Sequence, residues 1–225
     1  MKRIFIFILV GLIITGCAAS QQNSTFFDNP VCTPPCWENI RPGITTKDEA
    51  LTILSRIISI KQSVVDMNQA GVGYDDEIRF SVYKGKNEHM DVSLDILNDR
   101  TSSLSFDNFQ GDLGIQLNHA VELFGEPTKI FLTHGGFVDQ VTLINYQNGI
   151  AFGYGFTGNQ RVDSAMIEPG TEISEVLFFD PNQYENVIDS QVMLGVGRFN
   201  LDNLHPWAGY GSFKDKYWPP ATPSQ

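Results

Sequence analysis

The sequence has few of the residues that most often carry catalysis or bind metals. Its 225 residues include three cysteines and four histidines, and no histidine belongs to an H-E-x-x-H motif. The G-x-S-x-G order of a nucleophile elbow is also missing. The acidic clusters at residues 74–78 and 94–99 lack the ligand spacing and the glycine of a calcium loop. We therefore expect no metal site, no cofactor and no catalytic residue. A hydrolase whose carboxylate pair is assembled only by the fold is an alternative that the sequence leaves open.

One G-x-G-x-x-G string occurs at residues 153–158. A dinucleotide-binding loop of this kind opens a helix, because the helix N-terminus must meet the pyrophosphate. The next residues, 159–170, carry no helical apolar stripe before Pro169. These glycines therefore indicate a strand and a turn rather than a nucleotide site.

Basic residues are scarce as well. The chain has 15 Lys and Arg residues against 26 Asp and Glu residues, which gives a formal charge of −11 at neutral pH. Such a surface repels phosphate backbones and anionic lipid headgroups. We therefore expect no nucleic-acid partner.

No apolar run is long enough to cross a bilayer, since a spanning helix needs about 20 residues. The run at residues 4–14 follows Lys2 and Arg3, which is the charged-then-apolar order of an export signal. It ends in the letters ITGC at residues 14–17, which resemble the bacterial lipobox. That resemblance implies a signal peptide over residues 1–16 and a lipidated Cys17.

Lipidation of Cys17 implies a chain held on a membrane, because each buried methylene contributes about 0.8 kcal/mol and several acyl chains act together. The expected location is the cell membrane or the outer membrane, outside the cytoplasm. The mature chain has 13 basic and 26 acidic residues, a formal charge of −13. The alternative is a soluble secreted protein with an unlipidated signal.

Cys32 and Cys36 are the cysteines that remain after lipidation. A pair of cysteines in an exported chain favours a disulfide, although a redox pair or half of a metal site are alternatives. Residues 17–30, which precede this pair, begin with Cys17 and continue with mostly polar and small residues. They indicate a flexible tether.

Residues 31–110 are predicted to form a first α+β unit that opens with a helix. Thr45 or Thr46 can cap that helix, with Asp48 or Glu49 three residues on to complete a capping box. The apolar residues behind the cap share one helical face and are Ala50, Leu51, Leu54, Ile57 and Ile58.

Three segments of this unit then alternate apolar and polar residues, at 78–83, 90–96 and 104–106. Alternation with a period of two over short neighbouring segments is typical of an antiparallel meander with one solvent-exposed face. We expect the helix to cover the other, apolar face.

The pattern recurs over residues 111–160, the predicted second α+β unit. Its helical stripe is Leu117, Ala120, Val121 and Phe124, and the letters GEP at residues 125–127 end the helix. Strands are expected at 128–134, 139–147 and 149–156. On one face of the last strand the glycines indicate that another segment lies close or that the strand bends. The two helices align without a gap at an offset of 70 residues.

The Pro-Gly-x-Thr-Thr-x-x-Glu-Ala entry at residues 42–50 and the Phe-Gly-Glu-Pro end at 124–127 carry a family resemblance. The chain resembles tandem β-lactamase-inhibitory-protein-like units, the unit also found in SmpA/OmlA or BamE-like lipoproteins, and it is similar to uncharacterised bacterial lipoproteins. The resemblance implies α+β architecture, with helices on antiparallel sheets, and function by binding another protein. BamE-like lipoproteins have one unit and this chain has two, so inhibition of an enzyme is not implied.

Residues 161–225 are predicted to form a C-terminal extension packed on the two units. We expect one strand at 172–180 and a short helix that begins at Pro181. The aromatic end offers a possible binding surface made of Trp207, Tyr210, Tyr217 and Trp218. The interpretation that we favour is that these rings fold back and close the open end of a sheet, because residues 205–213 are too apolar to be left in water.

The sequence therefore predicts a non-catalytic, membrane-anchored envelope lipoprotein. The expected partners are the membrane, through the N-terminal lipid, and another envelope protein. A carbohydrate-binding lipoprotein that uses the C-terminal aromatic rings is an alternative, with a glycan as its ligand.

Overall fold

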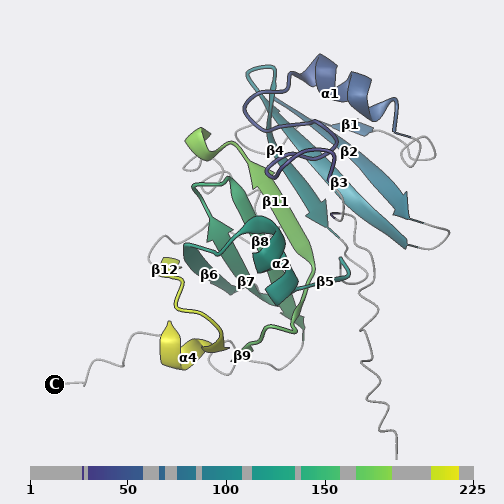
Figure 1. Ribbon diagram of the computed structural model, residues 1–225. Coiled ribbons are helices and arrows are strands. Elements are labelled where there is room, and N and C mark those ends of the chain that lie inside the picture. Colours follow the sequence, from purple (N-terminus) through teal and green to yellow (C-terminus); the bar gives the residue numbers. More distant parts are fainter. Residues whose placement is uncertain are drawn as a thin grey trace, which may run out of the picture.

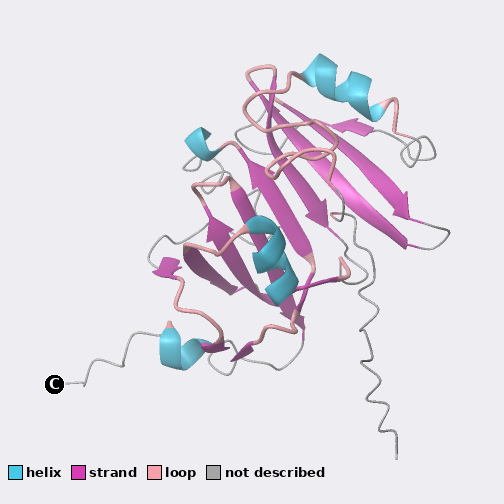
Figure 2. Ribbon diagram, in the orientation of Figure 1, coloured by secondary structure: helices cyan, strands magenta, loops and turns pink. Residues whose placement is uncertain are grey.

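The computed structural model describes nine parts of the chain. They are residue 27 and residues 30–57, 66–68, 75–84, 88–107, 113–134, 138–157, 166–183 and 204–217. Cys17, Trp218 and most of the predicted tether lie outside these residues. The described part consists mainly of antiparallel strands with a few short helices, an arrangement that fits an α+β or a mostly-β class (Figure 2).

Nine of the described strands form one antiparallel sheet (Figure 1). In order across the sheet they are β1 (Asp66–Asn68), β2 (Asp76–Lys84), β3 (Glu88–Leu97), β4 (Arg100–Asp107), β11 (Glu175–Phe179), β8 (Ile150–Thr157), β7 (Val138–Asn145), β6 (Lys129–His134) and β12 (Leu204–Pro206). The alternating segments that the sequence indicated as strands are all present. The buried apolar side chains of β2, β3 and β4 belong to one main core, whereas Phe131 of β6, Ile144 of β7 and Ala151 of β8 belong to a smaller cluster.

Strand β11 lies in the middle of the sheet, between β4 and β8. The sequence predicted a strand here, but as part of an extension packed on two units. All five of its side chains are buried, because Val176 and Phe178 face the main core while Leu177 and Phe179 face a smaller apolar cluster on the other side. The C-terminal part therefore supplies the strand that joins β2–β4 to β6–β8.

The strand order also relates the two meanders. Strands β4 and β8 both run antiparallel to β11, and the meanders extend from it in opposite directions. Both face the same main core. The strand order of the second meander is therefore the mirror image of that of the first.

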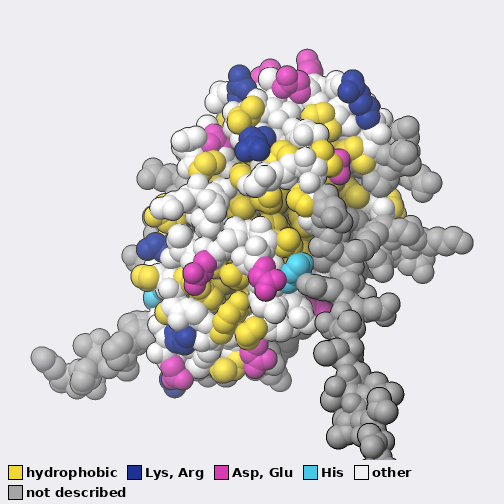
Figure 3. All heavy atoms as spheres, in the orientation of Figure 1, with side chains coloured by type: hydrophobic (Ala, Val, Ile, Leu, Met, Phe, Trp, Pro, Cys, Tyr) yellow, Lys and Arg dark blue, Asp and Glu magenta, His cyan; other side chains and the backbone are white. Residues whose placement is uncertain are grey.

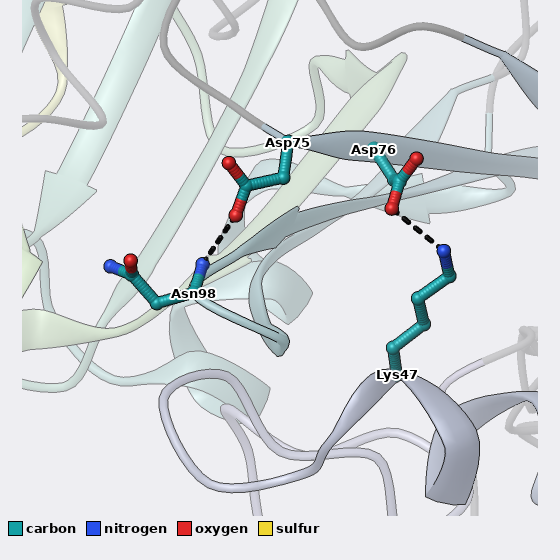
Figure 4. A network of polar contacts seen from close by, with 4 residues as sticks. All are labelled: Lys47, Asp75, Asp76 and Asn98. Carbon is teal, nitrogen blue, oxygen red and sulfur yellow. Dashed lines mark hydrogen bonds and ion pairs between the residues drawn. The ribbon is translucent and has the colours of Figure 1, made fainter.

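Helix α1 (Lys47–Leu54) begins at the predicted capping box. Thr46 Oγ1 accepts a hydrogen bond from the amide of Glu49, whose carboxylate accepts one from the amide of Thr46. Figure 4 shows how this end is held: the Lys47 ammonium pairs with Asp76 at 2.7 Å. The helix is shorter than the predicted stripe, since it ends before Ile57; Ile58 lies outside the described residues.

Helix α2 (Leu117–Phe124) has the same length as α1 and lies 70 residues further along the chain. Its buried side chains are Leu117, Ala120 and Phe124, and Val121 is half-buried. Gly125, with a φ of 89°, follows the helix and donates its amide to the carbonyl of Val121. The helix therefore ends where the sequence predicted.

Phe27 is part of the core. Its side chain is 5% exposed, and its ring meets Phe106, Phe124 and Phe178 edge to face at centroid distances of 5.1, 5.5 and 6.1 Å. The prediction of a flexible tether over residues 17–30 is therefore wrong at this residue. Burial of a Phe ring of this size contributes about 2–3 kcal/mol, enough to hold the chain against the sheet.

Smaller elements close the ends of the core. Strand β5 (Ile115–Gln116) pairs with β10 (Glu172–Ile173), and β9 (Met166–Ile167) pairs with β13 (Gly211–Ser212). A 3-10 helix, η3 (Pro181–Gln183), stands where the sequence predicted a helix to begin at Pro181. A single turn of helix, α4 (Phe213–Lys216), follows β13.

Gly153 explains the small residues on one side of β8. A Cβ at this position would lie 2.5 Å from the carbonyl oxygen of Val141 on the neighbouring strand. The close approach that the sequence indicated is therefore present, and only glycine permits it. No helix in the part of the chain described here is long and apolar enough to cross a membrane.

Candidate binding pocket at the end of the sheet

The predicted disulfide joins Cys32 to Cys36, with the Cα atoms 5.7 Å apart. Cys32 Sγ also accepts a hydrogen bond from the amide of Asn39 at 3.3 Å. Cys36 and Trp37 are buried, and the Trp37 ring stacks on Phe80 of β2 at 6.0 Å. This contact fixes the disulfide loop to the first meander.

The next turn is formed by Arg41, Pro42, Gly43 and Ile44. The amide of Ile44 donates to the carbonyl of Arg41 at 3.2 Å, and Gly43 has a φ of 77°. Proline at the second position and a positive φ at the third are the requirements of a type II turn. A Cβ on Gly43 would also lie 2.6 Å from the carboxyl carbon of Asp180, so glycine lets the turn lie against that side chain.

Asp180 follows β11 and shapes the other wall. Its amide donates to the carbonyl of Ser102 on β4 at 3.0 Å. Its Oδ1 accepts hydrogen bonds from the backbone and side-chain amides of Asn182, at 3.0 and 2.9 Å. The carboxylate thus caps η3 and is held within the wall.

These segments and the β7–β8 turn enclose a pocket of about 360 Å³, which we call the end pocket. It is lined by Pro34, Pro35, Arg41, Pro42, Gly43, Ile44, Gln147, Asn148, Asp180, Pro181 and Asn182. In Figure 1 the purple segment before α1 runs across the sheet toward the green end of β11. A volume of this size lies at the small end of the range of ligand pockets.

Ile44 stands at this pocket with its side chain 61% exposed. Its backbone is nevertheless fixed, because Arg100 Nη1 donates to the Ile44 carbonyl and the amide of Gly43 donates to Thr101 at 2.7 Å. A residue whose backbone is already fixed loses less conformational freedom when a partner covers its side chain. Such a residue is suited to anchor a binding partner.

Of the predicted aromatic binding surface, two described residues are partly exposed and one is buried. Trp207 and Tyr210 are half-buried against the core, with ring centroids 5.6 Å apart. Tyr217 is 3% exposed and stacks on Trp207 at 6.1 Å, so this member of the possible binding surface is buried. The Tyr217 hydroxyl donates to the carbonyl of Gly209 at 2.7 Å and accepts from the amide of Ala208 at 3.1 Å.

Phe213, which is not one of the residues of the predicted binding surface, is the most buried ring of this group at 1% exposure. It lies 5.2 Å from Tyr217. We call Trp207, Tyr210, Phe213 and Tyr217 the aromatic cluster. The cluster packs on the main core, as the favoured interpretation of these rings expects.

Tyr210 lies in a negative field at the edge of this cluster. Burial raises the pKa of its hydroxyl, and the carboxylates of Glu122 and Glu126 raise it further. Figure 3 shows hydrophobic side chains over α2 and the C-terminal segment, with acidic side chains among them. Trp207 and Tyr210 are thus the two described aromatic candidates that a ligand can reach.

Carboxylates also gather on the sheet face opposite the helices. Glu175 and Asp107 are cross-strand neighbours, and Gln140 Nε2 lies 3.4 Å from Glu175 Oε2. Burial raises the pKa of Glu175 well above its usual range, and the charge of Asp107 adds to this. Burial also raises the pKa of Asp107 to about 6, with Asp91 contributing in the same direction.

Asp95 belongs to the same face and is 3% exposed. Burial raises its pKa to about 6, although its Oδ2 accepts a hydrogen bond from the Ser103 hydroxyl at 2.6 Å. Neither Asp95 nor Asp107 nor Glu175 lines the end pocket. Among the described residues no three His, Cys, Asp or Glu side chains are placed to hold a metal ion.

The end pocket was not predicted from the sequence, because four separate segments form it. The local signals were the Arg-Pro-Gly turn at residues 41–43, the Asn-Gly turn at 148–149 and the Asp-Pro-Asn corner at 180–182. Each of these predicts a turn. Their meeting depends on the central position of β11.

No protein-family model, no curated protein and no solved structure matches this chain.

Proposed function

We propose that this chain is a non-catalytic envelope lipoprotein that binds another envelope protein through the end pocket. The observation that carries the proposal is Ile44, an exposed apolar residue at the pocket whose backbone is held by hydrogen bonds. Isolated exposed apolar residues are ordinary on protein surfaces. The fixed backbone and the adjoining proline-lined hollow distinguish this one.

Anchoring through lipid on Cys17 is the second part of the proposal. The ITGC motif at the end of a short apolar run supports it. We expect the Cys17→Ser variant to leave the membrane fraction and appear in the soluble extracytoplasmic fraction. Membrane retention of this variant, measured by fractionation and immunoblotting, would count against the anchor.

We also propose that the fold comprises two helix-plus-meander units of the kind found in β-lactamase-inhibitory-protein-like and BamE-like proteins. The equal lengths of α1 and α2, their offset of 70 residues and the meander after each support this. A simple duplication would give both meanders the same strand order, whereas here one order is the mirror image of the other. The two units are joined by β11, which pairs with β4 of the first meander and with β8 of the second.

The binding function is tested by crosslinking in intact cells, followed by purification of the protein and mass spectrometry. We expect a partner protein with the natural chain and about tenfold less of it with Ile44→Asp, because a buried aliphatic side chain contributes about 1.5–3 kcal/mol. Met166→Asp is the matched control, since Met166 is 48% exposed and lies on β9. Equal loss of the partner in both variants would remove the end pocket from the proposal.

A second candidate is carbohydrate binding by Trp207 and Tyr210. Their half-buried rings favour it, as do the carboxylates of Glu122 and Glu126 that act on Tyr210, since sugars stack on aromatic faces and bond to carboxylates. Titration with cell-envelope glycans should then quench tryptophan fluorescence, and Trp207→Ala should abolish the quenching without unfolding the protein. Unchanged quenching in that variant would exclude this surface.

A further inference from the structure

Two charged side chains line the end pocket, Arg41 and Asp180. Asp180 is 9% exposed, and its Oδ1 already accepts two hydrogen bonds from Asn182. The carboxyl group also lies against Gly43. One oxygen of this carboxylate is therefore engaged by the protein itself.

Arg41 is different. Its backbone amide donates to Thr45 Oγ1 at 2.8 Å, which fixes the start of the turn. Its side chain is half-buried, and within the described part of the chain no carboxylate pairs with it. By contrast, the guanidinium of Arg79 pairs with Glu77 at 2.7 Å, and that of Arg100 donates to Ile44. Arg41 thus offers up to five N–H donors to a ligand at the pocket.

The rest of the pocket fits an extended peptide. Its prolines and Ile44 provide apolar surface, while the side-chain amides of Gln147 and Asn148 can bond to a peptide backbone. Both amides belong to exposed residues of the β7–β8 turn. A volume of about 360 Å³ admits a few side chains rather than a whole protein surface.

The acidic character of the whole chain does not prevent a carboxylate from binding at this point. Charges on the surface are screened beyond about 8 Å at physiological ionic strength. A guanidinium bonded directly to a carboxylate acts well within that distance and makes two parallel hydrogen bonds. The net charge of the surface therefore does not exclude a carboxylate at Arg41.

We propose that the end pocket takes an extended segment of the partner protein in which an Asp or Glu side chain adjoins an apolar one. The Arg41 guanidinium binds the carboxylate, and the apolar side chain packs on Ile44 and the prolines. This inference rests on the proposed function and names the chemistry of the partner at the same pocket.

The test uses the full-length protein in detergent and a phage-displayed library of random 12-residue peptides as the probe. We expect enriched peptides to carry Asp or Glu next to an apolar residue. Replacing that acid by its amide should weaken binding about tenfold, as measured by fluorescence anisotropy, since a charge-assisted hydrogen bond is lost. Arg41→Gln should weaken the acidic peptide equally and leave the amide peptide unchanged.

Arg56→Gln is the control, because Arg56 is exposed and does not line the pocket. Thermal unfolding of each variant checks that the fold is intact. Enriched peptides whose binding depends on Ile44 but not on an acid or on Arg41 would overturn the carboxylate inference and leave the proposed function standing. If a partner is crosslinked in cells but no peptide is enriched, the inference that the pocket binds an extended segment would be overturned. Absence of both would refute the proposed function itself.

Discussion

The aromatic cluster and the end pocket differ in whether their side chains have hydrogen-bonding, stacking or ion-pair partners within the protein. In the cluster, Tyr217 has both hydrogen-bonding roles of its hydroxyl filled and its ring stacked on Trp207. At the end pocket, Ile44 is exposed and Arg41 has no carboxylate partner among the described residues. The aromatic residues that stand out in the sequence thus stabilise the fold. Ile44 and Arg41, which do not stand out in the sequence, are the residues that we propose contact a partner.

The largest effect that separates the two regions is expected at Tyr217. Tyr217→Ala removes a buried ring and should lower the free energy of unfolding by about 3–4 kcal/mol. Tyr217→Phe keeps the ring and should lower it by only about 1–2 kcal/mol, because two hydrogen bonds are lost. Urea unfolding monitored by circular dichroism measures both. A loss below 1 kcal/mol for Tyr217→Ala would show that the cluster does not stabilise the core.

Gly43 tests whether the end pocket is as rigid as its geometry implies. Gly43→Ala places a Cβ 2.6 Å from Asp180 at a φ of 77°, and we expect a loss of about 2 kcal/mol. Gly170→Ala is the matched control, since a Cβ there meets no atom within 4 Å. Equal stability of the two variants, measured by chemical unfolding, would mean that the turn shifts easily.

The carboxylates on the sheet face opposite the helices sharpen the comparison, because they are buried like Tyr217 and ionisable. Burial raises the pKa of Asp95 from its usual value to about 6, so the folded state holds a proton more tightly than the unfolded state. Stability should therefore rise as the pH falls from about 7 toward 4, by about 2–3 kcal/mol for this group alone. Asp107 and Glu175 shift in the same direction.

The measurement for these carboxylates is the free energy of unfolding between pH 5 and 8. Asp95→Asn should flatten the pH dependence and stabilise the protein at pH 8, where the charged form is penalised most. Stability that falls steadily on acidification through this range would contradict the assigned burial of these groups.

The smallest effect on stability is expected at the end pocket itself. Ile44→Ser should change the free energy of unfolding by less than about 0.5 kcal/mol, because the side chain is already mostly in water. The same variant should nevertheless reduce recovery of the partner from crosslinked cells. A destabilisation of 2 kcal/mol or more would indicate that Ile44 has a role in folding.

Local features of the fold could be predicted from the sequence. The Thr46 and Glu49 capping box, the stripe that ends at Phe124 and the alternation in β2 and β3 each depend on residues close in the chain. The disulfide between Cys32 and Cys36 is likewise local. Short-range patterns of this kind fix an element but not its neighbours.

The position of β11 could not be predicted in the same way. Its pairing of Glu175 with Asp107 joins residues far apart in the chain, and alternation does not specify a partner strand. The continuous apolar run at residues 176–179 was the available signal, since a strand buried on both faces loses its alternation. The end pocket was missed for the same reason, because Asp180 reaches Gly43 only when β11 lies beside β4.

The central claim is that a partner protein contacts Ile44. A photo-crosslinking amino acid placed at residue 44 in the lipidated, full-length protein tests it in intact cells, with the same probe at residue 166 for comparison. We expect a discrete crosslinked protein from position 44 and none from position 166. No crosslink at 44, or the same product from both positions, would contradict it.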